Sequence, residues 1–264
     1  MRTSEDFLQE LELLDISRQL GRLPSVVANT EAATSVVAAR EQRQTAARPQ
    51  LREEKMANPL AMPPMTFDPA RALRVAALDW TGLMAETAGC SACGLCKQRK
   101  QAVFGVGAES AAWLFVGEGP GAEEDQQGEP FVGQAGKLLD AMLAAVGLQR
   151  GHDVYIANVV KCRPPGNRTP TLEEAAACAP LLDRQIDLIQ PKMIVALGKT
   201  AVMRLTGSDA SMASMRGTVH SYRGIAVVAT YHPAYLLRSL TEKIKGWEDM
   251  LLARQTLVKQ MADG

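Results

Sequence analysis

Between residues 113 and 231 the chain alternates short, continuous apolar runs with longer segments whose apolar residues recur at helical spacing. Short apolar runs bounded by glycine or proline are typical of buried β-strands. Four such runs follow one another along the chain: WLFVGE at 113–118, VYIANVV at 154–160, MIVALG at 193–198 and GIAVVATY at 224–231. Strands that alternate with helices form a parallel sheet whose two faces are both covered. The pattern therefore predicts an α/β fold.

The segments around these runs predict helices with recognisable ends. Residues 71–89 precede the first strand, residues 132–147 lie between the first two strands, and residues 239–262 close the chain. Thr171 stands three residues before a glutamate, which is the spacing of a capping box, and so marks the start of another helix. Proline is tolerated in the first turn of a helix, so Pro180 is expected to open a new helical segment.

The first 69 residues lack this alternation. Residues 4–20 predict a short amphipathic helix with Ser4 as its N-cap. The stretch at 24–69 is rich in Ala, Arg, Gln and Thr and ends in NPLAMPPMTFDP, whose prolines block regular structure. We therefore expect two parts: residues 1–69, an N-terminal helix and a low-complexity linker that is partly disordered, and residues 70–264, a single folded domain.

The composition and the N-terminus favour a cytoplasmic protein over a membrane protein or a secreted one. The 29 Lys and Arg residues balance 29 Asp and Glu residues, and 47% of the chain is hydrophobic, which is typical of a globular protein. The N-terminus carries acidic residues where a signal peptide carries positive charge, and no apolar run approaches the ~18 residues of a membrane helix. We therefore expect a cytoplasmic protein that does not contact membranes.

Zero net charge conceals a separation of charge along the chain. Residues 118–129 hold five acidic residues and no basic one, whereas residues 192–240 hold six basic residues and one acidic residue. A basic stretch is the pattern of a nucleic-acid-binding surface, although a solvated face of ordinary lysines and arginines gives the same pattern. Charge alone leaves both interpretations open.

The five cysteines are Cys90, Cys93, Cys96, Cys162 and Cys178. In a chain without an export signal, cysteines are more often metal ligands or reduced thiols than disulfides. The first three have the spacing that opens a bacterial ferredoxin motif, but a lysine stands where its fourth cysteine would fall. One interpretation is a four-cysteine site, for zinc or an iron–sulfur cluster, that ties the loop around Cys93 to the sheet. In the other, Cys162 and Cys178 are buried thiols, and Cys90 and Cys93 form a redox pair.

A glycine-rich loop, Gly117-Glu118-Gly119-Pro120-Gly121, directly follows the first predicted strand. Ligands of open α/β folds bind at the carboxyl ends of the strands, which is where this loop lies. Its G-x-G-x-G order differs from the G-x-G-x-x-G of dinucleotide-binding folds, and the acidic residues after it would repel a pyrophosphate. The loop therefore suits a ligand that is neutral or develops positive charge, unless it is only a turn between a strand and a helix.

His232 stands at the end of the fourth predicted strand, and Pro233 follows it. The proline holds the backbone of the preceding residue in an extended conformation, so the histidine ring is held in one direction. Its position, with Arg238 shortly after it, fits a functional histidine, although a structural histidine is the commoner case. The loop from Asn158 to Arg168 joins an amide at a strand end to a segment without acidic residues, which suits either phosphate contacts or an exposed turn.

Together, three segments resemble the family 4 uracil-DNA glycosylases, the iron–sulfur members of the uracil-DNA glycosylase superfamily. They are GEGPGAEEDQQGEPFVGQAGKLLD, NVVKCRPPGNRTP and HPAYLLR, with C-x-x-C upstream, and the resemblance runs from about Leu83 to the C-terminus. It implies a three-layer sandwich with a central four-stranded parallel sheet, and hydrolysis of the N-glycosidic bond of uracil in DNA. It also implies a [4Fe–4S] cluster bound by Cys90, Cys93, Cys162 and Cys178, so that Cys96 is the one thiol that is not a ligand. We expect single- or double-stranded DNA that contains uracil as the partner, and a monomeric protein.

The resemblance also implies roles within the site. Glu118 and His232 correspond to the catalytic residues, which face the cation that forms on the sugar and the charge that grows on a uracil oxygen. Phe131 resembles the residue that stacks on the flipped base, and Asn158 resembles the amide that reads the uracil edge. Better-known members of the superfamily have an aspartate where this loop has Gly119, so the role of activating water falls to Glu118.

Six further residues complete the implied site. Gly119 and Gly121 would line the substrate pocket, and Glu124 would shape it against a 5-methyl group. Three arginines are candidates for contacts with DNA phosphates: Arg163, Arg168 and Arg238.

A non-catalytic alternative keeps the four-cysteine site and the basic stretch. It is an iron–sulfur or zinc module that binds nucleic acid and is related to domains associated with phage polymerases. The presence of Glu118, Asn158 and His232 favours the enzyme. A nucleotide-dependent oxidoreductase is disfavoured by the spacing of the glycines.

Overall fold

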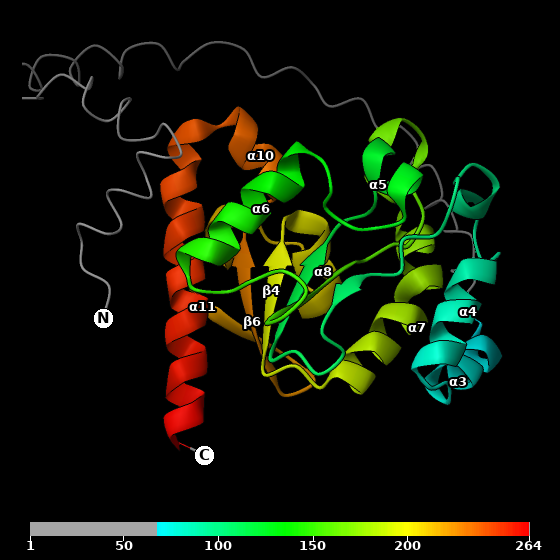
Figure 1. The fold of residues 1–264 in the computed structure, drawn as a ribbon, viewed down its shortest axis with the longest axis horizontal. Helices are drawn as coiled ribbons and strands as arrows, with labels where there is room; N and C mark the ends of the chain where they lie inside the picture. Colours follow the sequence, from blue (N-terminus) through cyan, green and yellow to red (C-terminus); the bar gives the residue numbers. More distant parts are fainter. Residues whose placement is uncertain (1–67, 264) are drawn as a thin grey trace, which may run out of the picture. The chain divides into compact units, whose positions relative to one another are not determined.

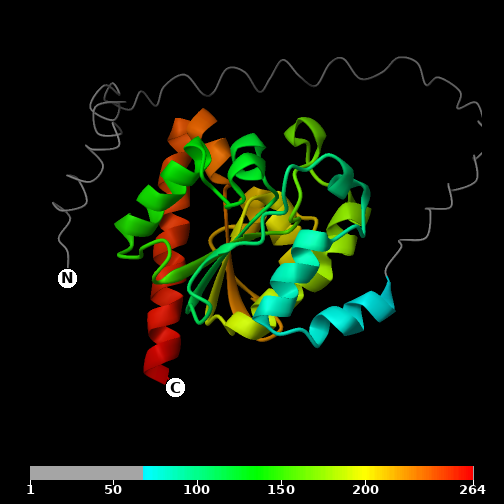
Figure 2. The ribbon, with the colours of Figure 1, turned by 45° about the vertical axis from the view of Figure 1, so that its right-hand side comes forward.

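The computed structural model describes residues 68–263 of this chain. The helix expected at 4–20 and almost all of the linker expected at 24–69 lie outside the described residues, so both expectations stay predictions. The described residues form a sheet with helices on both faces (Figures 1 and 2).

Six strands form one sheet in the order β1-β3-β2-β4-β6-β5. Its four central strands lie within the four apolar runs: β2 (Trp113–Gly117), β3 (Val154–Asn158), β4 (Met193–Leu197) and β6 (Ile225–Thr230). These four strands are parallel, and Trp113 of β2 lies opposite Val154 on one side and Met193 on the other. The prediction of a central four-stranded parallel sheet is confirmed.

The sheet is wider than expected, because an antiparallel strand is added at each edge. β1 (Val106–Gly107) pairs with β3, and β5 (Val219–Tyr222) pairs with β6. β1 has only two residues, and the side chains of β5 alternate between exposed and half-buried positions, so neither strand has a continuous apolar run. The whole sheet is therefore mixed and six-stranded, and the four-stranded prediction describes only its central part.

Alternating side chains of the central strands build a core on each face of the sheet. Leu114 and Val116 of β2 face one core, which four helices cover: α3 (Pro69–Ala76), α4 (Trp80–Gly89), α7 (Leu172–Ile189) and α8 (Lys199–Thr206). Trp113 and Phe115 face the other core, which two helices cover: α6 (Gln134–Ala145) and α11 (Lys243–Asp263). Figure 1 shows α6 and α11 on one side of the sheet and α7, α4 and α3 on the other. The three-layer sandwich is confirmed.

The remaining elements are short and lie in the loops. They are α5 (Ala122–Gln127), α9 (Met212–Met215), α10 (Pro233–Arg238) and the 3₁₀ helices η1 (Gly94–Lys97), η2 (Pro165–Asn167) and η3 (Leu240–Glu242). Within residues 68–263, no helix is both long enough and apolar enough to cross a membrane.

Two helix boundaries differ from the prediction. The stretch 71–89 is divided into α3 and α4, because Asp79 caps α4 and accepts a hydrogen bond from the N–H of Gly82 at 2.8 Å. The expected restart at Pro180 is wrong, because α7 continues through this residue. Leu181 and Leu182 are fully buried, so packing of the helix compensates for the hydrogen bond that the proline cannot donate.

The predicted start of α7 is confirmed. Thr171 is its N-cap, and its hydroxyl accepts from the N–H of Glu174 at 3.2 Å. The Glu174 carboxylate accepts in turn from the N–H of Thr171 at 2.8 Å, which completes the capping box.

Candidate active site

The loops that follow β2, β3, β4 and β6 meet at the carboxyl edge of the sheet and enclose a cleft of about 490 Å³. In Figure 1 the arrows of β4 and β6 point towards this edge, where α5 and α10 also lie. Nine residues that the sequence predicts for the substrate or DNA line the cleft: Glu118, Gly119, Gly121, Glu124, Phe131, Asn158, Arg168, His232 and Arg238. Ligands of α/β folds bind at this edge of the sheet, so the cleft is the candidate active site.

Asn158 and Phe131 approach each other next to Gly117, the last residue of β2. A Cβ atom on Gly117 would lie 2.4 Å from Oδ1 of Asn158 and 2.6 Å from Cζ of Phe131, so a side chain there would displace both. Asn158 is 2% exposed, and its Oδ1 accepts no hydrogen bond from the described residues. A buried, unpartnered amide oxygen is unfavourable unless a ligand supplies the donor.

Glu118 is held by Thr200, a residue that sequence reasoning missed. The Thr200 hydroxyl donates a hydrogen bond to Oε2 of Glu118. Thr200 is buried in the first turn of α8, directly after the carboxyl end of β4. Its neighbour Lys199 lines the cleft and was also missed. Their position just after a predicted strand is the signal that could have identified both residues.

His232 is the N-cap of α10, and its Nδ1 accepts a hydrogen bond from the N–H of Ala234 at 3.2 Å. Desolvation lowers the pKa of His232 to about 4; the nearby charge of Arg238 lowers it further, and Glu124 opposes the shift. The ring is therefore neutral at physiological pH, and its proton is on Nε2 because Nδ1 is an acceptor. The ring also stacks on Phe131, with 5.5 Å between the ring centroids. A neutral histidine held in this way can donate from Nε2 to an oxygen atom in the cleft.

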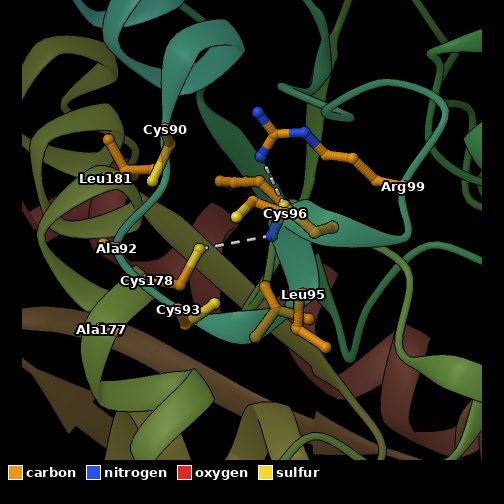
Figure 3. A pocket seen from close by; sticks show the side chains of 12 residues that line it. Cys90, Ala92, Cys93, Leu95, Cys96, Arg99, Ala177, Cys178 and Leu181 are labelled. Carbon is orange, nitrogen blue, oxygen red and sulfur yellow. Dashed lines mark hydrogen bonds between the residues drawn. The ribbon is translucent and has the colours of Figure 1, made fainter.

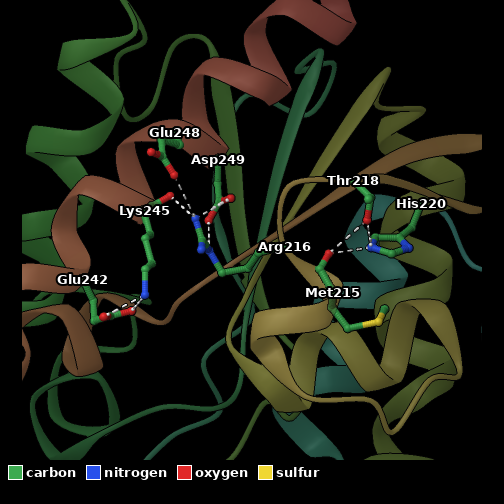
Figure 4. A network of polar contacts seen from close by, with 8 residues as sticks. All are labelled: Met215, Arg216, Thr218, His220, Glu242, Lys245, Glu248 and Asp249. Carbon is green, nitrogen blue, oxygen red and sulfur yellow. Dashed lines mark hydrogen bonds and ion pairs between the residues drawn. The ribbon is translucent and has the colours of Figure 1, made fainter. Parts of the chain in front are cut away.

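A buried ion pair supports the residue before His232. Nε of Arg216 donates to Oδ2 of Asp249 at 2.6 Å, and its Nη2 donates to Oδ1 at 2.9 Å (Figure 4). The two side chains are 10% and 1% exposed. The guanidinium lies over the Tyr231 ring, 4.9 Å from its centroid, so the pair joins α11 to the segment that carries the histidine.

Glu124 connects two loops of the cleft through backbone hydrogen bonds. Its Oε1 accepts from the N–H groups of Val132 at 3.0 Å and Gly133 at 3.1 Å. Its Oε2 accepts from the N–H of Gly121 at 3.1 Å, as in a capping box at the start of α5. The residue lines the cleft, as the resemblance implies, and it also fixes the chain on both sides of α5.

The three arginines expected at DNA phosphates have different surroundings. Arg238 is exposed and lines the cleft at the end of α10. Arg168 also lines the cleft, but its guanidinium pairs with both carboxylate oxygens of Glu174, at 2.7 Å each. Arg163 does not line the cleft, and its Nε donates to Oδ1 of Asn167 at 2.7 Å.

All five cysteines line one cavity beside the sheet, called the cysteine cavity below (Figure 3). They come from separate parts of the chain: Cys90 ends α4, Cys93 and Cys96 belong to the turn around η1, Cys162 follows β3, and Cys178 lies in α7. Within residues 68–263, no three His, Cys, Asp or Glu side chains lie close enough together to hold a single metal ion. The predicted ligands thus surround one cavity without meeting at one point.

N–H groups donate to the sulfur atoms of three predicted ligands. The contacts are Arg71 Nη2 to Cys90 Sγ at 3.3 Å, Arg99 Nη1 to Cys162 Sγ at 2.9 Å, and the backbone N–H of Lys161 to Cys178 Sγ at 3.3 Å. Such donors stabilise negative charge on sulfur and are among the groups that tune iron–sulfur clusters.

Burial opposes ionisation of three of the cysteine thiols. It raises the pKa of Cys93 and Cys162, and it raises the pKa of Cys178 to about 12 although Lys161 opposes the shift. A metal centre at this site would therefore displace protons from the thiols as it binds. Four thiols, three of which accept from N–H donors, with Arg71, Arg99 and Lys161 beside them, are a donor set that fits a four-thiolate cluster.

Comparison with known proteins relates this chain to one family. The model of the uracil DNA glycosylase superfamily matches residues 104–252, which contain the four central strands and the loops of the cleft. The type-4 uracil-DNA glycosylase of Thermotoga maritima is 46% identical over 175 residues, which are 65% of this chain and 91% of the relative. That of Pyrobaculum aerophilum is 48% identical over 157 residues, which are 56% of this chain and 80% of the relative. The chain belongs to the type-4 family of the uracil-DNA glycosylase superfamily.

This type-4 family member is also similar to a phage polymerase and to a glycosylase of another type. A DNA polymerase of Bacillus phage SP01 is 31% identical over 134 residues, which are 51% of this chain but only 14% of the polymerase. A type-5 uracil-DNA glycosylase of Thermus thermophilus is 31% identical over 153 residues. The higher identity and longer coverage of the type-4 relatives confirm the resemblance to family 4.

Proposed function

We propose that this protein is a uracil-DNA glycosylase, which hydrolyses the N-glycosidic bond of uracil in DNA, leaves an abasic site and so initiates base excision repair. One observation carries the proposal: the unpartnered Oδ1 of Asn158 is buried beside Phe131 in the cleft that Glu118 and His232 also line. The names of the type-4 relatives support it, because the chain covers 80% and 91% of the two relatives described above.

Asn158 supplies the chemistry that distinguishes uracil from cytosine. Its amide offers one acceptor and one donor. Uracil presents the N3–H donor next to the O4 acceptor, and these pair with the amide oxygen and the amide nitrogen. Cytosine presents an acceptor and an amino donor at the same places, so the buried Oδ1 would face another acceptor. Stacking on Phe131 holds the flipped base in the plane that this pairing requires.

Glu118 and His232 suit the two charges that develop as the bond breaks. The sugar becomes cationic and uracil leaves as an anion. The Glu118 carboxylate, which Thr200 orients, stabilises the cation and directs water to C1′. Nε2 of the neutral His232 donates to the uracil oxygen on which negative charge grows.

DNA is the proposed macromolecular partner, and Arg163, Arg168 and Arg238 are the proposed phosphate contacts. Arg238 and Arg168 lie at the cleft itself, which supports a path of the phosphate backbone along its rim. The monomeric state, the cytoplasmic location and the use of either single- or double-stranded DNA stay predictions from the sequence.

We further propose that Cys90, Cys93, Cys162 and Cys178 hold a [4Fe–4S] cluster and that Cys96 stays a free thiol. Each thiolate of such a cluster binds a different iron atom, whereas zinc needs all its ligands around one centre. The resemblance to family 4, whose members are the iron–sulfur glycosylases of the superfamily, favours the cluster over zinc. The bound cluster would supply iron–thiolate bonds that join α4, the η1 turn, the loop after β3 and α7. Hydrolysis of a glycosidic bond transfers no electrons, so we assign the cluster a structural task.

The colour and metal content of the purified protein test the cluster. We expect a brown protein with broad absorbance near ~400 nm and about four iron atoms per chain. Stoichiometric zinc without iron in anaerobically prepared protein would contradict the proposal.

A labelled oligonucleotide with a single uracil tests the enzymatic activity. After incubation and alkaline cleavage at abasic sites, we expect one product, at the uracil position, and none when cytosine or thymine replaces uracil. Asn158→Asp should lose the product, because a carboxylate cannot donate to a uracil carbonyl. Binding of the oligonucleotide without cleavage would favour the non-catalytic module instead and overturn the proposed activity.

A further inference from the structure

Phe131 has a backbone conformation that its side chain does not favour. Its φ is +55°, in the left-handed region that residues other than glycine rarely adopt. The residue is 6% exposed and lines the cleft. A conformation of this kind persists only where the surroundings determine it, and such positions occur often at functional sites. The contacts around Phe131 therefore hold it in this conformation.

Arg150 binds the carbonyl groups of this segment. Its Nη1 donates to the carbonyl of Pro130 at 3.0 Å, and its Nη2 donates to the carbonyl of Phe131 at 2.9 Å. Its Nε donates to Oδ1 of Asp140 in α6 at 2.7 Å, which fixes the guanidinium plane. The Arg150 side chain is only 22% exposed. Three donors of one planar group thus have three separate acceptors, which a lysine ammonium cannot reproduce with the same geometry.

Glu124 holds the other side of the same segment. It accepts from the N–H groups of Val132 and Gly133, directly after Phe131. The segment also approaches α6 closely, because a Cβ atom on Gly136 would lie 1.7 Å from the carbonyl oxygen of Phe131. Consecutive carbonyls face a guanidinium, and the N–H groups that follow face a carboxylate, so the backbone at 130–133 is fixed from both sides.

We propose that Arg150 is a positioning residue, which holds Phe131 in its left-handed conformation and so places the ring on which the flipped base stacks. This inference rests on the proposed function. Arg150 does not line the cleft, so it acts through Phe131 rather than on the substrate. Without the Arg150 guanidinium, the carbonyl groups of Pro130 and Phe131 lose their charged donors, and the backbone can relax to negative φ. The ring then turns away from the plane of the base.

A double-mutant cycle in single-turnover uracil excision tests this role. We expect Arg150→Ala to lower the rate about tenfold in the wild-type background and less than twofold in the Phe131→Ala background, because the ring through which Arg150 acts is then absent. Arg150→Lys keeps the charge but not the paired donors, so it should cause most of the decrease in rate that Arg150→Ala causes. An equal loss in both backgrounds, or no loss in the wild-type background, would overturn the proposal.

A control variant separates positioning from general stability. Arg184 also donates to a backbone carbonyl, that of Leu78 at 2.6 Å, and neither residue lines the cleft. Arg184→Ala should lower the melting temperature as Arg150→Ala does, but leave the excision rate unchanged. A rate that follows melting temperature in both variants would show a structural role only.

Backbone chemical shifts give a readout that does not need activity. The Cα and Cβ shifts of Phe131 report its φ, and we expect them to move from left-handed to extended values in Arg150→Ala. Unchanged shifts would overturn the positioning role even if the wild-type enzyme excises uracil. Absence of uracil excision by the wild-type protein, with the shift change present, would overturn the proposed function and leave the conformational role of Arg150 standing.

Discussion

The cleft and the cysteine cavity are built on different parts of the fold. The cleft gathers polar side chains from loops at the ends of four parallel strands, and it encloses about 490 Å³. The cysteine cavity lies beside the sheet, between α4, the η1 turn, the loop after β3 and α7, and its sulfur atoms have apolar neighbours and N–H donors. The first arrangement suits a reaction, and the second suits a group that stays in place.

The loop after β3 joins the two regions. Asn158 lines the cleft, and Cys162, four residues later, lines the cysteine cavity. Between them Lys161 is buried; its Nζ donates to the carbonyl of Asn158 at 3.0 Å and to Oε1 of Gln185 at 2.6 Å. Damage to the cysteine cavity should therefore reach the cleft through this loop. Loss of a side chain in the cleft should leave the cysteine cavity intact.

The largest effect is expected from Cys162→Ala. Because the proposed cluster contributes binding free energy to folding, the variant should lose its iron and its absorbance near ~400 nm, and its melting temperature should fall by roughly 10 °C or more. Uracil excision should be lost as well, because the loop that carries Asn158 is released. Cys96→Ala is the matched control in the same cavity and should keep iron, melting temperature and rate. Bleaching of Cys96→Ala together with retained iron in Cys162→Ala would contradict the ligand assignment.

The next effect is expected in the cleft, from His232→Ala and Glu118→Ala. Each residue acts on charge that exists only in the transition state, so each substitution should lower the single-turnover rate by roughly 10²–10³. DNA affinity and iron content should stay at wild-type values, which is the opposite pattern to Cys162→Ala. Excision at the wild-type rate by His232→Ala would show that the HPAYLLR segment is structural and that the proposed mechanism is wrong.

The protonation state of His232 adds a pH-dependent test of the cleft, which the cysteine cavity should not share. The folded-state pKa, about 4, lies below the ordinary value of 6.5, so folding favours the neutral ring. The stability that this ring contributes is present in full above pH 6.5 and is lost as the pH falls through about 4. The proton on Nε2 and the neutral acceptor Nδ1 should be visible by ¹⁵N NMR of the imidazole down to about pH 5. An imidazolium signal for His232 at pH 6 would contradict the neutral donor.

The fold was predictable where the sequence shows a regular pattern of apolar residues. It was less predictable where a hydrogen bond or tertiary packing determines where an element begins or ends. Each central strand is buried on both faces, so it appears in the sequence as a continuous apolar run. The edge strands lack such runs because solvent reaches β5 and β1 is too short. The division at Asp79 depends on a cap, and the continuity of α7 through Pro180 depends on tertiary packing, which outweighs the local preference of proline.

The candidate site was predictable to the extent that its residues stand at strand ends or in recognisable motifs. This placed Glu118, Asn158 and His232 in one cleft. Sequence reasoning missed Thr200, although that residue also follows a strand, because a threonine does not by itself indicate a catalytic or binding role. Arg150 had no signal in the sequence, since it acts on backbone carbonyls that only the folded chain brings within its reach.

A smaller effect is expected from Thr200→Val, which removes the donor to Glu118 and keeps the shape of the side chain. The carboxylate stays in place but loses a hydrogen bond worth about 1–1.5 kcal/mol, so the single-turnover rate should fall about tenfold. Thr200→Ser restores the hydroxyl and should restore most of the rate. In the Glu118→Ala background, Thr200→Val should have no further effect. A loss that serine does not restore would assign Thr200 a packing role instead.

The smallest effect is expected at the rim of the cleft, from Arg238→Ala. The side chain is exposed and faces solvent, so its loss should leave iron content, melting temperature and the rate of the bound complex unchanged. DNA affinity should fall a few-fold at low salt, and the slope of log affinity against log salt should decrease by about one, because one phosphate contact releases about one counterion. Arg223→Ala is the control, since Arg223 belongs to the same basic stretch but pairs with Asp187 at 2.9 Å and does not line the cleft. If both substitutions reduce the salt dependence equally, the contact with DNA is a diffuse property of the basic stretch. If only Arg238→Ala does, the phosphate backbone passes the end of α10, beside the histidine and apart from the cysteine cavity.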